Sequence, residues 1–346
     1  MSDVYICGLG AVSPAGWGVP SLSEALDKGE PLPIQPLERP GWAKPLRARP
    51  VPNAGVRPAF VAHPRLRRSS PLTLYATAAA LEALRGLPPA MDGRFRLGLV
   101  VSLQNGCVQY TYKFFDEALK DPATASPLLF PETVHAAPAS HIAALLGNTP
   151  VVYTFVGDPT SFVQGLSVAA DWLEESLVDA CLVIGAEEIN WLSADALWHL
   201  DRSAVIAGGA GALCLSRDPK SSLGVRMAAI TDSHTYSACF PRLQAARAMR
   251  EQLGGSGSEL LCDGLGGSAR ADAPEAAAWS DWTGPRLSLK RILGEGLMAG
   301  AAWQCVAACD AVARGQFRAA NVSLVGGHQQ AIGARFVGAG QPSSAT

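Results

Sequence analysis

PVVYTFVGDPTSFVQGLSVAADWLEESLVDACLVIGAEE, residues 150–188, is the stretch that decides the fold of this chain. Residues 151–156 are β-branched and aromatic, which predicts a buried strand. Asp158 is a favoured helix N-cap and Pro159 suits the first helical position. A helix is therefore predicted over residues 160–176, directly after a tight turn.

The turn before this helix bears on function. In many α/β enzymes such a turn holds a nucleophile at the helix N-terminus, where the helix dipole stabilises an anion. The turn here offers Asp158, Pro159, Thr160 and Ser161 and no cysteine. Beyond the helix, the apolar residues 180–184 predict a second strand, which completes a strand-helix-strand unit.

The composition is that of an ordinary globular protein. Of the 346 residues, 48% are hydrophobic and 17% are charged, and the net charge is −2. This balance gives no indication of binding to nucleic acid or to an anionic membrane. No apolar run reaches the roughly 18 residues of a membrane span, and a predicted strand over residues 4–8 leaves no room for a signal peptide. We expect a cytoplasmic protein.

Neither a metal site nor a cofactor is expected. The eight cysteines are scattered, as in proteins of a reducing compartment. Cys305 and Cys309 lie four residues apart on a predicted helix, but no second pair of ligands follows at zinc-site spacing, so we expect buried thiols. Gly8, Gly10 and Gly16 do not have the spacing of the dinucleotide-binding motif G-x-G-x-x-G.

A region rich in proline and arginine, residues 31–64, interrupts the regular pattern and is predicted to be a surface excursion. Arg65, Arg67 and Arg68 follow it, just before a predicted alanine-rich helix over residues 72–84. Two interpretations stay open: a solvated helix start, or a docking patch for an acidic partner.

The second half of the chain repeats the arrangement of the first. Strand patterns alternate with helical patterns in both, which predicts stacked sheets with helical layers. We place the halves at residues 1–216 and 217–346. The last nine residues, 338–346, follow the closing strand and are expected to fray.

These landmarks resemble the β-ketoacyl synthases of the thiolase fold, the condensing enzymes of fatty acid and type II polyketide synthesis. The resemblance extends over nearly the whole chain. It rests on blocks in family order: GLGAVSPAG (8–16), SPLLFP (126–131), ASH (139–141), VDACLVIGAEE (178–188), GGAGALCLS (208–216), SLKRILGEGLMAGA (288–301) and SLVGGHQ (323–329).

The resemblance implies an α/β protein whose two pseudo-repeated halves form a layered α-β-α-β-α sandwich. It also implies three catalytic positions: a cysteine that takes the acyl chain from an acyl carrier protein, and two histidines that promote decarboxylation and stabilise the enolate and oxyanion. A lysine supports them.

This chain departs from the family at each catalytic position. Counting without gaps from SPLLFP places the nucleophile at Pro159, and counting from the residues before the strand places it at Asp158. The histidines fall on Gly264 and Glu295, whereas the lysine is retained as Lys290. Lys290 is expected to form a salt bridge with Glu295 or with Asp272. Catalysis by this chain alone is therefore not expected.

The family includes such proteins, the chain length factors, which pair with an active ketosynthase and shape its acyl pocket. By resemblance, Leu129 caps the partner's pocket, Gln104 lies at a pocket floor, and Val325 replaces a gating phenylalanine. The aromatic residues Tyr110 and Phe114 either line such a tunnel or pack in the core or dimer interface. Subunits of this fold pair through the strand before the nucleophile, here Val151, Val152, Tyr153, Thr154 and Phe155.

Three hypotheses follow. The first is a non-catalytic chain-length-factor-like subunit of a heterodimer with an active ketosynthase, served by an acyl carrier protein, in polyketide, polyene or fatty-acid-like synthesis. The second is a diverged acyltransferase or decarboxylase that uses Asp158, Glu295 and Lys290. The third is a scaffold that docks carrier protein through the arginine cluster without shaping a pocket.

Overall fold

The computed structural model describes residues 3–87, 95–147, 149, 151–237, 240–255 and 257–340. In the first half, five strands pair in the order β6-β5-β7-β9-β1. Strands β5, β6 and β7 are parallel, and β9 runs antiparallel to both β7 and β1. Their bounds are β1 (Val4–Ser13), β5 (Leu97–Leu103), β6 (Val152–Val156), β7 (Ala180–Glu187) and β9 (Gly209–Ser216).

The second half has the same strand order, β13-β12-β14-β15-β10, and the same strand directions. A short antiparallel contact between β1 and β10, centred on Tyr5 and Arg226, joins the two series into one continuous sheet. The exact domain limits at residues 216 and 217 stay a prediction. The strands are β10 (Val225–Ile230), β12 (Leu260–Asp263), β13 (Arg286–Ser288), β14 (Ala319–Val325) and β15 (Gln330–Gly338), with short strands β2 (Gly16–Trp17) and β11 (His234–Thr235) beside β1 and β15.

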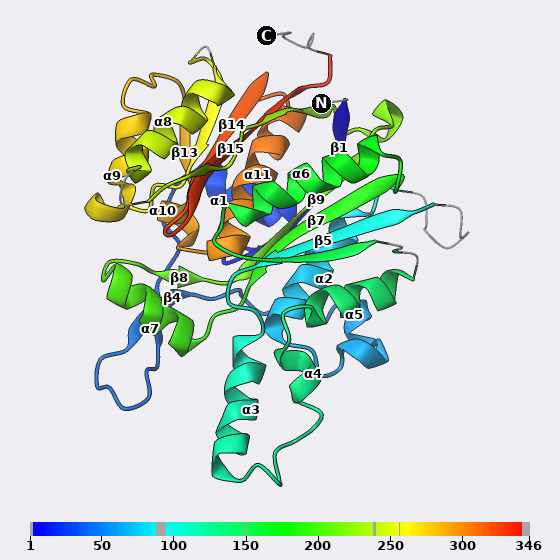
Figure 1. Ribbon diagram of the computed structural model, residues 1–346, viewed down its shortest axis with the longest axis vertical. Coiled ribbons are helices and arrows are strands. Elements are labelled where there is room, and N and C mark those ends of the chain that lie inside the picture. The colour runs from blue at the N-terminus through cyan, green and yellow to red at the C-terminus, as the bar shows by residue number, and fades with distance from the viewer. Residues whose placement is uncertain are drawn as a thin grey trace.

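Helices form three layers around these strands (Figure 1). Helices α6 (Ser161–Glu174) and α11 (Leu297–Ala313) lie in the middle and contact strands of both halves. Helices α2 (Pro71–Ala83) and α5 (Ala137–Leu146) cover the outer face of the first half. Helix α8 (Arg242–Leu253) and helix α9 (Ala269–Ala278) cover that of the second. The predicted α-β-α-β-α layering is confirmed.

Helix α11 is the most deeply buried helix of the sandwich, with 14 of its 17 residues inside the core. Its small side chains let the first-half sheet come close: a Cβ at Gly211 of β9 would lie 2.8 Å from that of Ala302. Trp303 is the one large ring at this contact. Its Nε1 donates to the carbonyl oxygens of Val12 and Ala210, both at 3.0 Å, and so links the helix to β1 and β9.

The remaining elements flank the sandwich. Figure 1 shows α3 (Val108–Lys120) and α4 (Phe130–Thr133) extending from one end of the body as an arm. A three-stranded sheet of β3 (Gln35–Leu37), β4 (Leu46–Arg49) and β8 (Ile206–Ala207) packs against α7 (Trp191–Leu200). Others are α1 (Val19–Lys28), α10 (Leu289–Leu293) and the 3₁₀ turns η1 (Ala59–Ala62), η2 (Pro64–Leu66) and η4 (Pro219–Ser221).

Strand β6 is not the buried strand that its composition predicts. It ends the strand order and pairs only with β5 among the described residues. Val152, Tyr153 and Val156 are 41%, 50% and 54% exposed. Branched and aromatic residues favour any strand, so composition alone could not separate an edge strand from a central one.

Two further expectations need correction. The excursion of residues 31–64 is not without regular structure, because it carries β3 and β4. The tail does not fray from residue 338, since Gly338 belongs to β15 and Ala339 donates its N–H to the carbonyl of Gly224. Residues 341–346 lie outside the described residues. Every cysteine that the structure describes is a buried free thiol, and Cys239 lies outside the described part.

The first glycine-rich block can be tested through Gly10. A side chain there would overlap the backbone carbonyl of Ala79 in α2, so β1 packs against this helix only without a Cβ. We expect Gly10→Ala to lower the free energy of unfolding by about 2 kcal/mol or more. Gly55→Ala is the matched control, because Gly55 has open space around it, and it should change stability by no more than about 0.5 kcal/mol. Equal urea midpoints for the two variants would contradict this packing.

Candidate functional site

The turn before α6 is built differently from the predicted helix cap. The helix begins at Ser161, so Asp158 lies before the N-cap residue Thr160. One Asp158 oxygen, Oδ1, accepts the N–H of Thr160 at 3.0 Å and also the Thr160 hydroxyl. The expectation that Asp158 caps the helix is therefore wrong. It closes a tight turn instead, an alternative that short polar side chains offer the backbone.

The Asp158 carboxylate is enclosed by a second loop. It is 5% exposed, and a side chain at Gly326, after β14, would overlap its Oδ2. The Tyr236 hydroxyl donates to the Gly326 carbonyl at 2.5 Å and holds that loop in place. Gln330 of β15 donates to the Thr160 hydroxyl oxygen at 2.8 Å. The turn is thus packed into the protein, and Asp158 has the surroundings of a structural residue.

Lys290 was expected to form a salt bridge with Glu295 or with Asp272, and in the structure its partner is Glu295. Lys290 Nζ lies 2.7 Å from Glu295 Oε2, and the two side chains are 22% and 19% exposed. Glu295 Oε1 also accepts the N–H of Leu297 at 2.9 Å, at the start of α11. Burial opposes the charge of Lys290, but Glu295 above all, with Glu275 and Asp272, raises its pKa. Lys290 therefore keeps its charge, and each of the two side chains already has a partner.

Asp272, the other predicted partner of Lys290, instead binds backbone N–H groups. Its two carboxylate oxygens accept the N–H groups of Gly266 and Gly267, at 3.1 and 2.7 Å. It thus fixes the glycine-rich loop between β12 and α9, the loop in which the family carries its first histidine.

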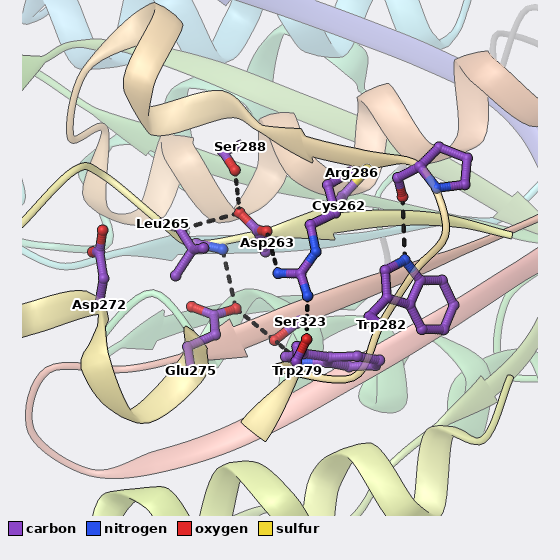
Figure 2. A network of polar contacts seen from close by, with 12 residues as sticks. Cys262, Asp263, Leu265, Asp272, Glu275, Trp279, Trp282, Arg286, Ser288 and Ser323 are labelled. Carbon is purple, nitrogen blue, oxygen red and sulfur yellow. Dashed lines mark hydrogen bonds and ion pairs between the residues drawn. The ribbon is translucent and has the colours of Figure 1, made fainter. Parts of the chain in front are cut away.

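Gly264 opens this loop, and the Glu275 carboxylate lies beside it. Figure 2 shows Glu275 with its neighbours Ser323 and Trp279. Glu275 Oε1 accepts the Gly264 N–H at 3.1 Å and the Ser323 hydroxyl at 2.5 Å. A Cβ at Gly264 would lie 2.8 Å from Glu275 Oε2. Trp279 Nε1 donates to Ser323 Oγ at 3.0 Å and closes the network. Burial, with a contribution from the neighbouring Asp263, raises the pKa of Glu275 to about 7.

Asp263, at the end of β12, is the second buried acid in Figure 2. Its Oδ1 accepts the Ser288 hydroxyl at 2.6 Å and the Leu265 N–H at 3.2 Å. Arg286 lies 3.6 Å from its Oδ2, and burial raises the pKa of this carboxyl. Sequence reasoning missed this network. Its members come from four elements, β12, α9, β13 and β14, and a lone acid at the end of a short strand gave no signal.

The second hypothesis needs Asp158, Glu295 and Lys290 to act together. Lys290 and Glu295 form an ion pair, but within the described ranges no hydrogen bond or ion pair joins Asp158 to either of them. The described residues also hold no cluster of three or more His, Cys, Asp or Glu side chains suited to a metal. None of the helices in the described ranges is long and apolar enough to cross a membrane.

The residues predicted to face a pocket or partner lie in different places. Gln104 donates its N–H to Glu187 at 2.5 Å where β5 leads into the arm. Leu129 and Tyr110 are half-buried on the arm, where the Phe114 ring lies 5.5 Å from that of Phe130. Val325 packs with the outer core beneath α8, and its gating position stays a prediction. The three arginines of the docking hypothesis are exposed: Arg65, Arg67 and Arg68.

Comparisons with known proteins agree on the fold. No family model matches the chain, and no curated protein matches it either. Among solved structures, the ishigamide ketosynthase/chain length factor is 19% identical with a TM-score of 0.79, and the alignment covers 98% of this chain and 100% of that one. A β-ketoacyl synthase from Burkholderia phymatum STM815 is 17% identical with a TM-score of 0.83, over 98% and 100% of the two chains.

A third structure is the AntDE:AntF complex, a type II polyketide acyl-carrier protein with its ketosynthase bound to the hexaketide. It is 14% identical with a TM-score of 0.81, over 97% of this chain and 99% of that one. Likeness at such identities establishes the fold. The chain therefore has the thiolase-like fold of ketosynthases and chain length factors.

Glu275 makes the stability of this site depend on pH. Its pKa rises from an ordinary 4.5 to about 7 in the folded protein. The stability that neutral Glu275 contributes is complete below pH 4.5 and is lost as pH rises to about 7, a loss of about 3 kcal/mol. Glu275→Gln stays neutral and keeps an oxygen for Gly264 and Ser323. We expect urea titrations from pH 4.5 to 7.5 to show a smaller loss in this variant.

The matched control is Glu174→Gln, at an exposed position in the last turn of α6. Its stability curve should follow that of the unmodified chain over the same pH range. A Glu275→Gln curve parallel to that of the unmodified chain would contradict the burial of a neutral acid.

Proposed function

We propose that this chain is a non-catalytic, ketosynthase-like subunit of the chain-length-factor type. In this role it pairs with an active β-ketoacyl synthase and shapes the acyl pocket of that enzyme, in type II polyketide synthesis or a related polyene or fatty-acid-like pathway. One observation carries the proposal. In an intact condensing-enzyme scaffold, the positions of all three catalytic side chains hold structural residues: Asp158 or Pro159, Gly264 and Glu295.

The chemistry of each replacement argues against condensation by the chain itself. Proline has no nucleophile, and the carboxylate of Asp158 is enclosed in its turn. Glycine cannot stabilise an oxyanion through a side chain, and a Cβ at position 264 would lie 2.8 Å from Glu275 Oε2. The Glu295 carboxylate would repel an enolate, and it is neutralised by Lys290.

Two adjoining surfaces support pairing with another subunit. The first is the free edge of β6, whose backbone groups can continue a sheet into a second molecule. The second is the arm of α3 and α4, which exposes large apolar side chains. Monomeric proteins seldom leave apolar groups of this size together in solvent. On the arm these are Phe115, Leu119, Leu128 and Phe130.

The exposed arginines before α2 support docking of an acidic carrier protein. Arg65 lies in the turn η2, and Arg67 and Arg68 follow it directly. All three side chains are exposed. Clustered cations of this kind raise the rate at which an acidic partner arrives. In this proposal the carrier protein serves the pair, and the catalytic cysteine belongs to the partner subunit.

The pairing can be tested with a ketosynthase that retains its Cys-His-His set and is encoded beside this chain. We expect the two to co-purify and to condense acyl and malonyl carrier proteins, whereas this chain alone condenses neither. Val152→Asp places a charge on the free edge of β6 and should weaken association at least about tenfold. Val56→Asp is the control, because Val56 is 85% exposed and lies on the excursion.

Two results would count against pairing: condensation or decarboxylation by the purified chain alone, or equal affinities of the Val152→Asp and Val56→Asp variants for the ketosynthase.

A role in chain length predicts an effect of Leu129. Leu129→Ala removes bulk from the residue placed at the partner's pocket, so we expect longer products from the complex, measured by mass spectrometry. Leu177→Ala removes the same bulk from the end of α6, where Leu177 is 44% exposed, and should leave product length unchanged. Unchanged products from the Leu129 variant would contradict a pocket-shaping role.

A further inference from the structure

The loop that carries Leu129 has little hydrophobic packing to hold it. Leu128 and Phe130, on either side of Leu129, are 62% and 57% exposed, and Val134 beyond them is also exposed. Local backbone bonds close the turn, with the Glu132 N–H donating to the Leu129 carbonyl at 3.0 Å. Its place against the body of the protein must therefore come from other contacts.

One such contact is a pair of polar side chains, Glu132 of α4 and His141 of α5. His141 Nε2 lies 2.9 Å from Oε1 and 3.1 Å from Oε2 of Glu132. Both side chains are 12% exposed. His141 Nδ1 is buried and unpaired within the part of the chain that the structure describes, so a proton on Nε2 gives the arrangement that leaves no buried donor without a partner.

The pair connects the Leu129 loop to a well-packed helix. Helix α5 is anchored in the core, since Ala139 and Ile142 are buried against α2 and β5. Another tie of the loop, from the Ser126 N–H to Glu117 at 2.9 Å, leads only to α3, which has no buried residue of its own. Of these two side-chain contacts, the one between Glu132 and His141 connects the loop to a helix that packs on the sheet.

We propose that Glu132 and His141 are a positioning pair, which sets where Leu129 stands against the acyl pocket of the partner subunit and so sharpens the length of the product. This inference rests on the proposed function. Neither residue touches the growing chain. Both act through the turn from Leu129 to Glu132, and their loss should let the loop take several positions.

The test compares two substitutions at one position. His141→Met removes the donor at similar bulk, whereas His141→Gln keeps an N–H near the position of Nε2. The first readout is hydrogen exchange of residues 126–135 in the complex with the ketosynthase. We expect exchange about tenfold faster in His141→Met and near the original rate in His141→Gln. His199→Met is the matched control, because His199 also faces an aspartate but is 62% exposed.

The second readout is the distribution of product lengths. His141→Met should give a broader set of products at a similar mean length, and His141→Gln should restore the single product. Unchanged hydrogen exchange in His141→Met would overturn the proposal, as would a narrow product distribution from a complex whose loop exchanges faster.

Failure of the proposed function would look different. The Leu129→Ala variant would then leave product length unchanged. In that case the pair would not position Leu129 toward a pocket, even if hydrogen exchange showed that it links α4 to α5.

Discussion

Both halves of the molecule rest on one buried contact, the packing of α11 between their sheets. Its small side chains let β9 approach at Gly211, and the Trp303 ring fixes the helix to two strands at once. Dense packing of this kind tolerates little change. The positions at which the family has its catalytic groups lie outside it, in loops at strand and helix ends. Chemistry can therefore be lost without loss of the fold.

At the positions that correspond to the family's catalytic groups, the residues of this chain make structural contacts. Asp158 closes a turn, and Glu295 accepts the N–H of Leu297 at the start of α11 and pairs with Lys290. Glu275 accepts the N–H of Gly264. Buried acids are costly unless they are hydrogen-bonded or neutral. Each of these acids has found backbone or hydroxyl donors, and the result is a set of contacts that holds loops where an active site would keep room for substrate.

Much of this could be predicted from the sequence, and the failures have physical causes. Motif blocks in family order predicted the layers, and the fold confirms them. The absence of the family's cysteine and histidines predicted a non-catalytic subunit, which stays a proposal. The composition of β6 predicted a buried strand, because branched and aromatic residues suit edge and central strands alike, whereas the family resemblance placed this strand at a subunit interface. The remaining contacts depend on the three-dimensional fold. Only the fold brings Glu275 to Ser323 and pairs Lys290 with Glu295, while Asp272 accepts the N–H groups of Gly266 and Gly267.

The open edge of β6 also bears on how the cell must handle this protein. An exposed strand with apolar side chains is a template on which further chains can add, which leads to aggregation. Until something covers that edge, each newly made molecule is at risk in proportion to its concentration. Balanced synthesis with a protein that covers β6 would then protect solubility as well as assembly, and overproduction of this chain alone would shift it toward insoluble material.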